Sequence, residues 1–128
     1  RDRDMLKYSC KKGGEVMTLE ERVDLLEFQV ELLFNNTEVD RFIYESKLTR
    51  EQYRSIMELM DIMRKKIDAG EAVHHYDFES AIYERVPEKN GDYHFCELIA
   101  KLFAEEHRWE EVFPALYGDM PKYGGTVE

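Results

Sequence analysis

Residues 18–34 read TLEERVDLLEFQVELLF, the strongest amphipathic stretch in the chain. Thr18 and Glu21 have the spacing of a capping box. In this motif the hydroxyl accepts a hydrogen bond from a backbone N–H of the first turn, and the carboxylate accepts one from the cap residue. The stretch therefore predicts a helix that begins directly after Thr18, and the other elements must pack around it.

The apolar residues of this helix fall into two stripes. The first recurs at alternating spacings of four and three, as in a coiled-coil seam, and comprises Leu19, Val23, Leu26, Val30 and Leu33. The second, Leu25, Phe28 and Leu32, lies nearly opposite it at about 100° per residue. We interpret the first stripe as the seam of a homo-oligomer and the second as part of the protomer core. The alternative is a central helix of a monomeric bundle with neighbours on both sides.

Length and composition indicate a helical domain. The chain has 128 residues, of which 43% are apolar and 36% charged, with three prolines and seven glycines. Acidic residues interrupt the first helix well short of the roughly 18 to 20 apolar residues of a membrane span. Two cysteines form no disulfide framework. We predict an all-α, single-domain bundle of five or six helices over residues 17–117, located in the cytoplasm and not on a membrane.

The two ends differ from this body. Residues 1–16 lack periodicity, and Lys12-Gly13-Gly14-Glu15 matches a translated ribosome-binding site. We therefore expect a disordered, non-native leader over 1–16, with Met17 as the natural start. Residues 118–128 have little to bury, and we expect a flexible tail.

Cap and breaker residues divide the rest of the body into further helices, expected over residues 38–47, 50–69, 78–86, 93–105 and 108–117. Thr37, Asp77 and Asp92 are the expected N-caps, and Gly70 is placed to end the second of these helices. Pro114 falls inside the last range, so that helix either bends there or begins near it.

The body is strongly acidic. Residues 17–128 hold 25 acidic and 13 basic side chains. Such a charge repels nucleic acid and anionic membranes, so any macromolecular partner besides a second copy should be a basic protein. A candidate acidic face comprises Glu84, Glu88, Glu97, Glu105, Glu106, Glu110 and Glu111. We interpret it as a solvated face. The alternative is a DNA mimic, a phage or mobile-element inhibitor of a nucleic-acid-binding protein.

Few residues indicate chemistry. Glu71, His74 and His75 are weak candidates for a metal site, but the chain has no second Glu-x-x-His with which to build a di-iron centre. A metal-dependent enzyme at these residues is the third alternative. Cys96 is interpreted as a buried structural thiol, because no histidine and orienting group accompany it in a nucleophile pattern. We expect no cofactor and no catalytic residue.

Several stretches resemble the YhaI-like proteins of low-GC Gram-positive bacteria, a small family of unknown function. They are RVDLLEFQVELL (22–33), LTREQYRSIMELMD (48–61), HHYDFESAI (74–82) and ELIAKLFAEEHRWEEVF (97–113). The resemblance implies a compact, helical, cytoplasmic bacterial protein that self-associates through its first helix. It implies no functional residues. The family has a glycine in the turn between the last two helices, where this chain has Glu106-His107-Arg108.

Taken together, these features predict a non-enzymatic protein that acts through protein–protein interaction and forms a homo-oligomer. Its cellular role is not indicated by any residue.

Overall fold

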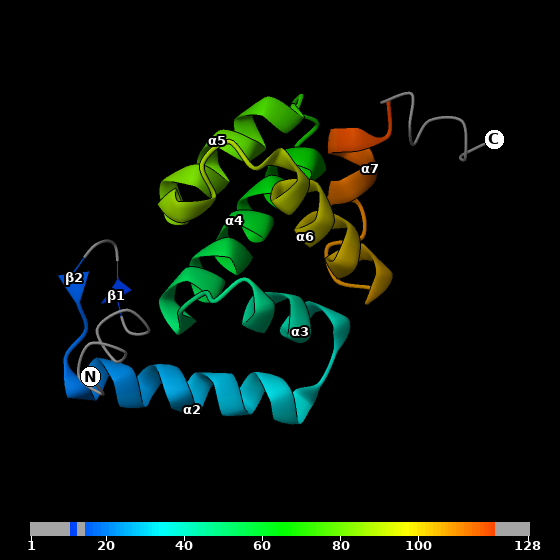
Figure 1. The fold of residues 1–128 in the computed structure, drawn as a ribbon. Helices are drawn as coiled ribbons and strands as arrows, with labels where there is room; N and C mark the ends of the chain where they lie inside the picture. Colours follow the sequence, from blue (N-terminus) through cyan, green and yellow to red (C-terminus); the bar gives the residue numbers. More distant parts are fainter. Residues whose placement is uncertain (1–10, 13–14, 120–128) are drawn as a thin grey trace. The chain divides into compact units, whose positions relative to one another are not determined.

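A computed structural model of the chain describes residues 11–12 and 15–119. Six α-helices account for most of these residues: α2 (Leu19–Asn35), α3 (Glu38–Glu45), α4 (Arg50–Asp68), α5 (His75–Arg85), α6 (Tyr93–Glu105) and α7 (Val112–Tyr117) (Figure 1). A 3-10 turn, η1 (Pro87–Lys89), and two-residue strands β1 (Lys11–Lys12) and β2 (Glu15–Val16) complete the secondary structure of this part of the chain. The all-α class predicted from the sequence is confirmed.

Contacts between residues divide the chain into two compact units, residues 1–50 and residues 51–128. The first unit holds β1, β2, α2, α3 and the first residue of α4, and the second holds the rest. The sequence analysis places both units in one domain of residues 17–117, a boundary that stays a prediction.

The expected leader and tail lie largely outside the described residues. Within the leader, β1 and β2 pair antiparallel, with Lys11 opposite Val16 and Lys12 opposite Glu15. Of the tail, Gly118 and Asp119 are described and residues 120–128 are not. Within the described ranges, no helix combines the length and the apolar character that crossing a bilayer requires.

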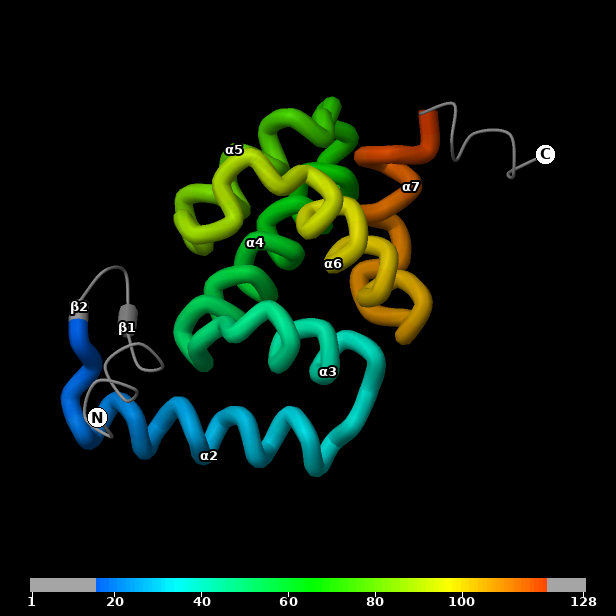
Figure 2. Tube along the Cα trace, in the orientation of Figure 1, coloured from blue at the N-terminus to red at the C-terminus, as the bar shows by residue number. Residues whose placement is uncertain are grey.

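The first unit is a helical hairpin. Asn36 ends α2 in the left-handed conformation with φ of 55°, and its N–H donates to the Leu32 carbonyl over 2.9 Å. The Thr37 hydroxyl then accepts from the Asp40 N–H over 3.0 Å and caps α3. Because two residues make the turn, α3 returns alongside α2 (Figure 2). The N-cap predicted at Thr37 is confirmed.

The hairpin has a small apolar core. Phe28 and Leu32 of α2 are buried, as are Val39 and Ile43 of α3. Both α2 residues belong to the second stripe of the helix, which the sequence analysis assigned to the protomer core. α3 therefore packs against the face of α2 that carries this stripe.

In the second unit, α4 ends in a Schellman motif. Gly70 has φ of +80°, its N–H donates to the Ile67 carbonyl over 3.0 Å, and the Glu71 N–H donates to the Lys66 carbonyl over 2.9 Å. Glycine adopts this left-handed conformation without the Cβ strain of other residues. The predicted end of this helix is confirmed.

Helices α5, α6 and α7 gather beside α4 within the second unit, and α6 packs on both α5 and α7 (Figure 1). The core of this unit is apolar and aromatic, and its largest fully buried side chains are Tyr117, Phe78, Phe103, Ile56, Met60, Ile82 and Ile99. The buried stripe of α4 comprises Tyr53, Ile56, Leu59, Met60 and Met63, and Ile62 beside it is exposed. It lies at the edge of that stripe, where the helix turns toward solvent.

The predicted start of α5 is wrong, whereas the start of α7 confirms the alternative in which that helix begins near Pro114. α5 begins at His75 rather than at Phe78, and its N-cap, His74, makes no side-chain capping bond. Asp77 lies in the first turn instead, where a carboxylate interacts favourably with the helix dipole. α7 begins at Val112, which puts Pro114 in the first turn, where a missing N–H leaves no hydrogen bond unmade.

The chain between α6 and α7 leaves the helical conformation at two positions. His107 and Trp109 have φ values of 64° and 51°, in the left-handed region. The helix therefore does not begin at Arg108. The left-handed conformation is the one that glycine adopts most readily, and here His107 adopts it.

Candidate functional site

The first apolar stripe of α2 is exposed. We call its five residues, Leu19, Val23, Leu26, Val30 and Leu33, the α2 seam. Their exposed fractions run from 46% at Val23 to 70% at Leu19. Phe34, which the sequence analysis left out of the stripe, is 87% exposed and follows it directly. Such a run of exposed aliphatic side chains on one helix face is typical of an interaction surface.

The opposite faces of α2 thus have different environments. Phe28 and Leu32 are buried and Leu25 is half-buried, whereas every residue of the α2 seam is exposed. Sequence spacing alone gave two stripes without saying which one the protomer covers. In the structure, the second stripe belongs to the core and the first remains available.

Capping hydrogen bonds define both ends of α2. The Thr18 N–H donates to Glu21 Oε1 over 2.9 Å, and the Glu21 N–H donates to the Thr18 hydroxyl over 3.1 Å. This is the capping box predicted from the sequence, and it fixes the start of the helix at Leu19, directly after the N-cap Thr18. At the other end, the left-handed Asn36 stops the helix directly after the seam.

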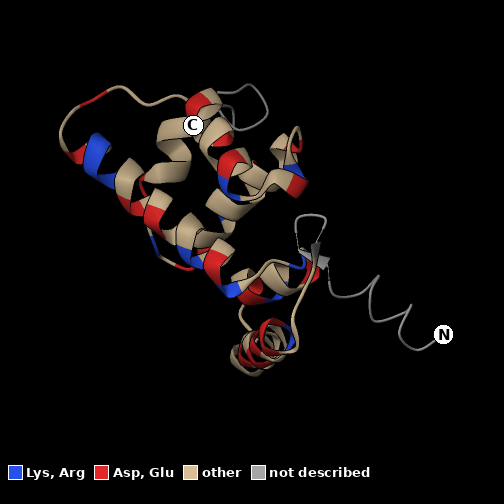
Figure 3. Ribbon diagram, turned by 90° about the vertical axis from the view of Figure 1, so that its left-hand side faces the viewer, with Lys and Arg blue, Asp and Glu red and all other residues tan. Residues whose placement is uncertain are grey.

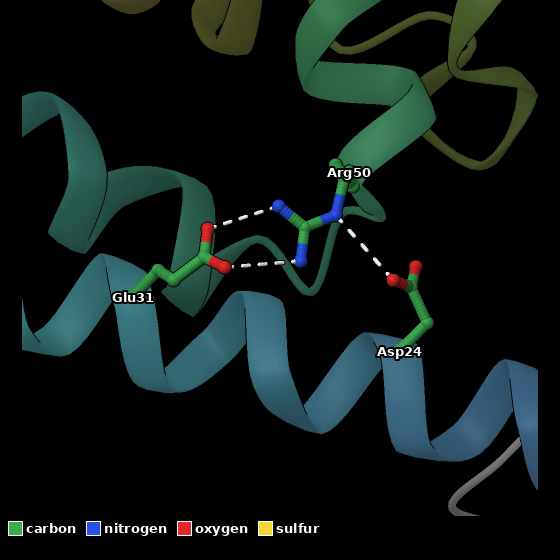
Figure 4. Close-up of polar contacts among 3 residues, drawn as sticks. All are labelled: Asp24, Glu31 and Arg50. Carbon is green, nitrogen blue, oxygen red and sulfur yellow. Dashed lines mark hydrogen bonds and ion pairs between the residues drawn. The ribbon is translucent and has the colours of Figure 1, made fainter.

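Arg50 holds one flank of α2 through its guanidinium group (Figure 4). Its two Nη atoms donate to the Glu31 carboxylate over 2.9 and 3.2 Å, and its Nε lies 3.5 Å from Asp24 Oδ1. The same group stacks 5.1 Å from the centre of the Phe28 ring. The two acids are seven residues apart, so the arginine spans two turns of the helix on a flank beside the seam.

The hydrogen bonds from Arg50 lower the pKa of Glu31 below its usual range, and the same bonds raise the pKa of Arg50. Both groups are therefore charged at neutral pH. Arg50 could not be identified from the sequence, because 19 residues separate it from Glu31 and no local pattern links them.

Charged side chains border the α2 seam. Glu20 and Glu27 are exposed along one edge, and Arg22 is half-buried along the other. Figure 3 presents α2 nearly end-on at the bottom and shows acidic positions, in red, alternating with uncharged ones, in tan. The apolar strip is therefore narrow and has charged edges, as in a coiled-coil helix.

The second unit contains a buried polar pair that the sequence did not indicate. The Tyr117 hydroxyl donates to Glu79 Oε2 over 2.8 Å, and His75 Nδ1 lies 3.4 Å from the same oxygen. Burial, together with the adjacent carboxylate, raises the pKa of Tyr117 far above its ordinary value. The phenol therefore stays protonated and serves as a hydrogen-bond donor between α7 and α5.

Cys96 is buried, as the sequence analysis expected. Burial raises the pKa of its thiol to about 12, and burial likewise raises the pKa of Tyr83 to about 12. Because a thiolate is the reactive form of cysteine, this thiol has no nucleophilic character at neutral pH.

The weak metal candidates do not converge. Glu71 and His74 are exposed, and His75 is turned toward Glu79. Among the described residues, no group of three or more His, Cys, Asp or Glu side chains is arranged to hold a metal ion. Beside them, a shallow groove of about 280 Å³ is lined by Leu59, Met63 and other residues of α4 and α5. Its volume is at the lower limit of small-molecule sites, which run from about 300 to 1,000 Å³.

The candidate acidic face needs a correction at Glu97, which is 4% exposed and belongs to the buried side of α6. Basic or polar partners bind four of the other six carboxylates: Gln52 with Glu88, Arg108 with Glu106, His107 with Glu110, and Arg64 with Glu111. Glu84 and Glu105 are exposed. The four partners thus lie among the carboxylates of the face. The face is therefore not the continuous negative surface that a phosphate-like array requires.

In comparisons with protein-family models, with curated proteins and with solved structures, no match to this chain was found. The resemblance to the YhaI-like family stays a prediction.

Proposed function

We propose that the protein is non-enzymatic, acts through protein–protein interaction and associates with further copies of itself through the α2 seam. One observation carries this proposal: all five residues of the seam are exposed, while the opposite stripe of the same helix is buried. A surface helix needs only one apolar face to pack on its own core. The second face therefore requires another explanation, and a partner supplies it.

The spacing of the seam favours a helix from a second copy as that partner. Alternation of four and three residues keeps apolar side chains facing a second helix along its whole length, and an identical helix presents the same pattern in return. Burying a Leu or Val side chain fully stabilises a structure by about 1.5 to 3 kcal/mol. Each copy contributes its seam and Phe34, so association buries two sets of apolar side chains and both sets add to its free energy.

The settings of two reactive groups among the described residues favour the non-enzymatic part of the proposal. The thiol of Cys96 is buried and has a raised pKa, and the buried phenol of Tyr117 donates a hydrogen bond to Glu79. Neither group is arranged as a nucleophile beside a base.

Absolute mass by light scattering across a concentration series tests the proposal. We expect the mass to rise with concentration from one chain of 15.3 kDa to a fixed multiple of it. A chain that remains monomeric up to millimolar concentration would overturn the proposal.

A second candidate function is an acidic inhibitor of a basic, nucleic-acid-binding protein, expected from a phage or mobile element. The observation in its favour is the excess of 25 acidic over 13 basic side chains in residues 17–128. The ion pairs within the acidic face and the burial of Glu97 argue against it. Capture of a nucleic-acid-binding protein that is lost as salt rises would favour this candidate, because salt screens exposed charges.

A further inference from the structure

The exposed stripe allows a heptad register to be assigned, which the two competing stripes in the sequence did not permit. In a heptad, position d follows a by three residues, and the next a follows d by four. The steps along the α2 seam place Val23 and Val30 at a, and Leu19, Leu26 and Leu33 at d. Phe28, at position f, faces α3 on the opposite side, so the assigned register agrees with the burial of α2.

The a and d positions of the seam carry different types of aliphatic side chain. Both a positions carry the β-branched residue valine, and all three d positions carry leucine. In parallel coiled coils, β-branched residues at a with leucine at d favour two strands, whereas isoleucine at d favours higher oligomers. For parallel helices, the seam therefore indicates two chains.

The charged edges of the seam favour the parallel orientation. Arg22 occupies position g, and Glu20 and Glu27 occupy position e. In a parallel pair, the g residue of one helix faces the e residue of the next heptad in its partner, so Arg22 faces the partner's Glu27 twice. In an antiparallel pair, e faces e, which brings glutamates of the two copies together.

We propose that two copies of this chain pair through α2 as a parallel, two-stranded coiled coil, with Arg22 of each copy facing Glu27 of the other. α3 does not obstruct this arrangement, because it packs on the Phe28 and Leu32 face of α2. This inference rests on the proposed self-association and adds its stoichiometry, orientation and charge pairing.

Cross-linking tests the orientation. Leu19→Cys is introduced in a Cys10→Ser background, where the buried Cys96 cannot react. A disulfide requires the two Cα atoms to lie within about 7 Å. In a parallel pair the two introduced thiols meet across the seam, and we expect nearly complete disulfide-linked dimer on mild oxidation. The control is Glu21→Cys in the same background, because Glu21 lies away from the seam.

A charge exchange tests the pairing. Arg22→Glu and Glu27→Arg should each weaken the homodimer roughly tenfold at low salt, and an equimolar mixture of the two variants should restore dimerisation close to that of the wild type. In the mixture every g–e′ contact again joins opposite charges. An antiparallel pair has g–g′ and e–e′ contacts but no g–e′ contacts, so neither exchange would break an opposite-charge pair and the tenfold weakening would be absent.

The outcomes separate the two proposals. A dimer by light scattering that cross-links through position 19 and weakens with Arg22→Glu supports both. A dimer that fails to cross-link there overturns the parallel orientation and leaves self-association intact. A trimer or tetramer overturns the stoichiometry alone, and a monomer overturns both proposals.

Discussion

Val30→Asp tests the proposed function most directly. Val30 lies near the centre of the interaction surface and is 64% exposed in the protomer. In a paired helix it would be covered, so each copy loses about 1 kcal/mol of hydrophobic stabilisation when the valine is removed. The new carboxylate must also be desolvated or remain in a gap, which costs at least a further 1 kcal/mol per copy. The two copies together lose about 4 kcal/mol, so we expect the dimer dissociation constant to rise by about 1,000-fold.

Folding of the protomer should change little. Valine and aspartate have similar helix propensities, and substitution of an exposed residue alters the free energy of unfolding by about 0.5 kcal/mol or less. The assay is light scattering or sedimentation over a concentration series, together with urea unfolding followed by circular dichroism. The expected result is a folded chain with the mass of a monomer.

Two further variants serve as controls. Tyr76→Asp places the same charge at an exposed aromatic residue of α5 outside the α2 seam, and should leave the mass unchanged. Leu32→Asp places it at a buried residue of α2 and should unfold the first unit. If Val30→Asp is folded and still dimeric, the stripe has been chosen wrongly. If it unfolds as Leu32→Asp does, the seam faces the chain's own core.

Three other predictions follow from the local geometry. Thr18→Ala removes the side-chain bond of the capping box and should lower the free energy of unfolding by about 1 kcal/mol, measured by urea titration against Thr18→Ser as the control. Arg50→Met should return the pKa of Glu31 upward toward its ordinary value, as followed by NMR titration. The pKa of Glu31 is lowered in the folded chain, so the ion pair stabilises the folded chain above about pH 4.5. This stabilisation is lost as the pH falls through the lowered pKa. Acidification should therefore destabilise Arg50→Met less than the wild type. Cys96 should resist alkylation at pH 8 until urea unfolds the chain, as peptide mass spectrometry would reveal, and rapid labelling of folded protein would contradict its burial and its raised pKa.

Helix limits that depend on neighbouring residues could be predicted from the sequence. Asp92 caps α6, which spans the predicted residues 93–105, because its carboxylate accepts from the Phe95 N–H over 3.1 Å. The helix limits at Thr18 and Gly70 were likewise predictable, because the hydrogen bonds there join residues within five positions of each other. The prediction failed at Asp77, because a carboxylate is favourable both as a cap and in the first turn, and sequence does not distinguish the two.

The candidate site was predictable only in part. The apolar spacing of α2 identified the five residues of the seam correctly as one face. The burial of Phe28 depends on packing by α3. The ion pair of Arg50 joins it to Glu31, which lies 19 residues away in the sequence. Glu97 was assigned to the acidic face because its charge is visible in the sequence, whereas its burial on α6 is not.

The sequence by itself determined the all-α class, the start of α2 at its capping box and the pattern of two apolar stripes, since each follows from contacts between residues close in the chain. Only the tertiary structure decided which stripe is buried, that Glu79 pairs with Tyr117, and that Cys96 lies in a setting that raises its pKa. The physical reason is that burial depends on segments distant in sequence meeting in space. A helical period specifies which residues share a face of a helix, but not what covers that face.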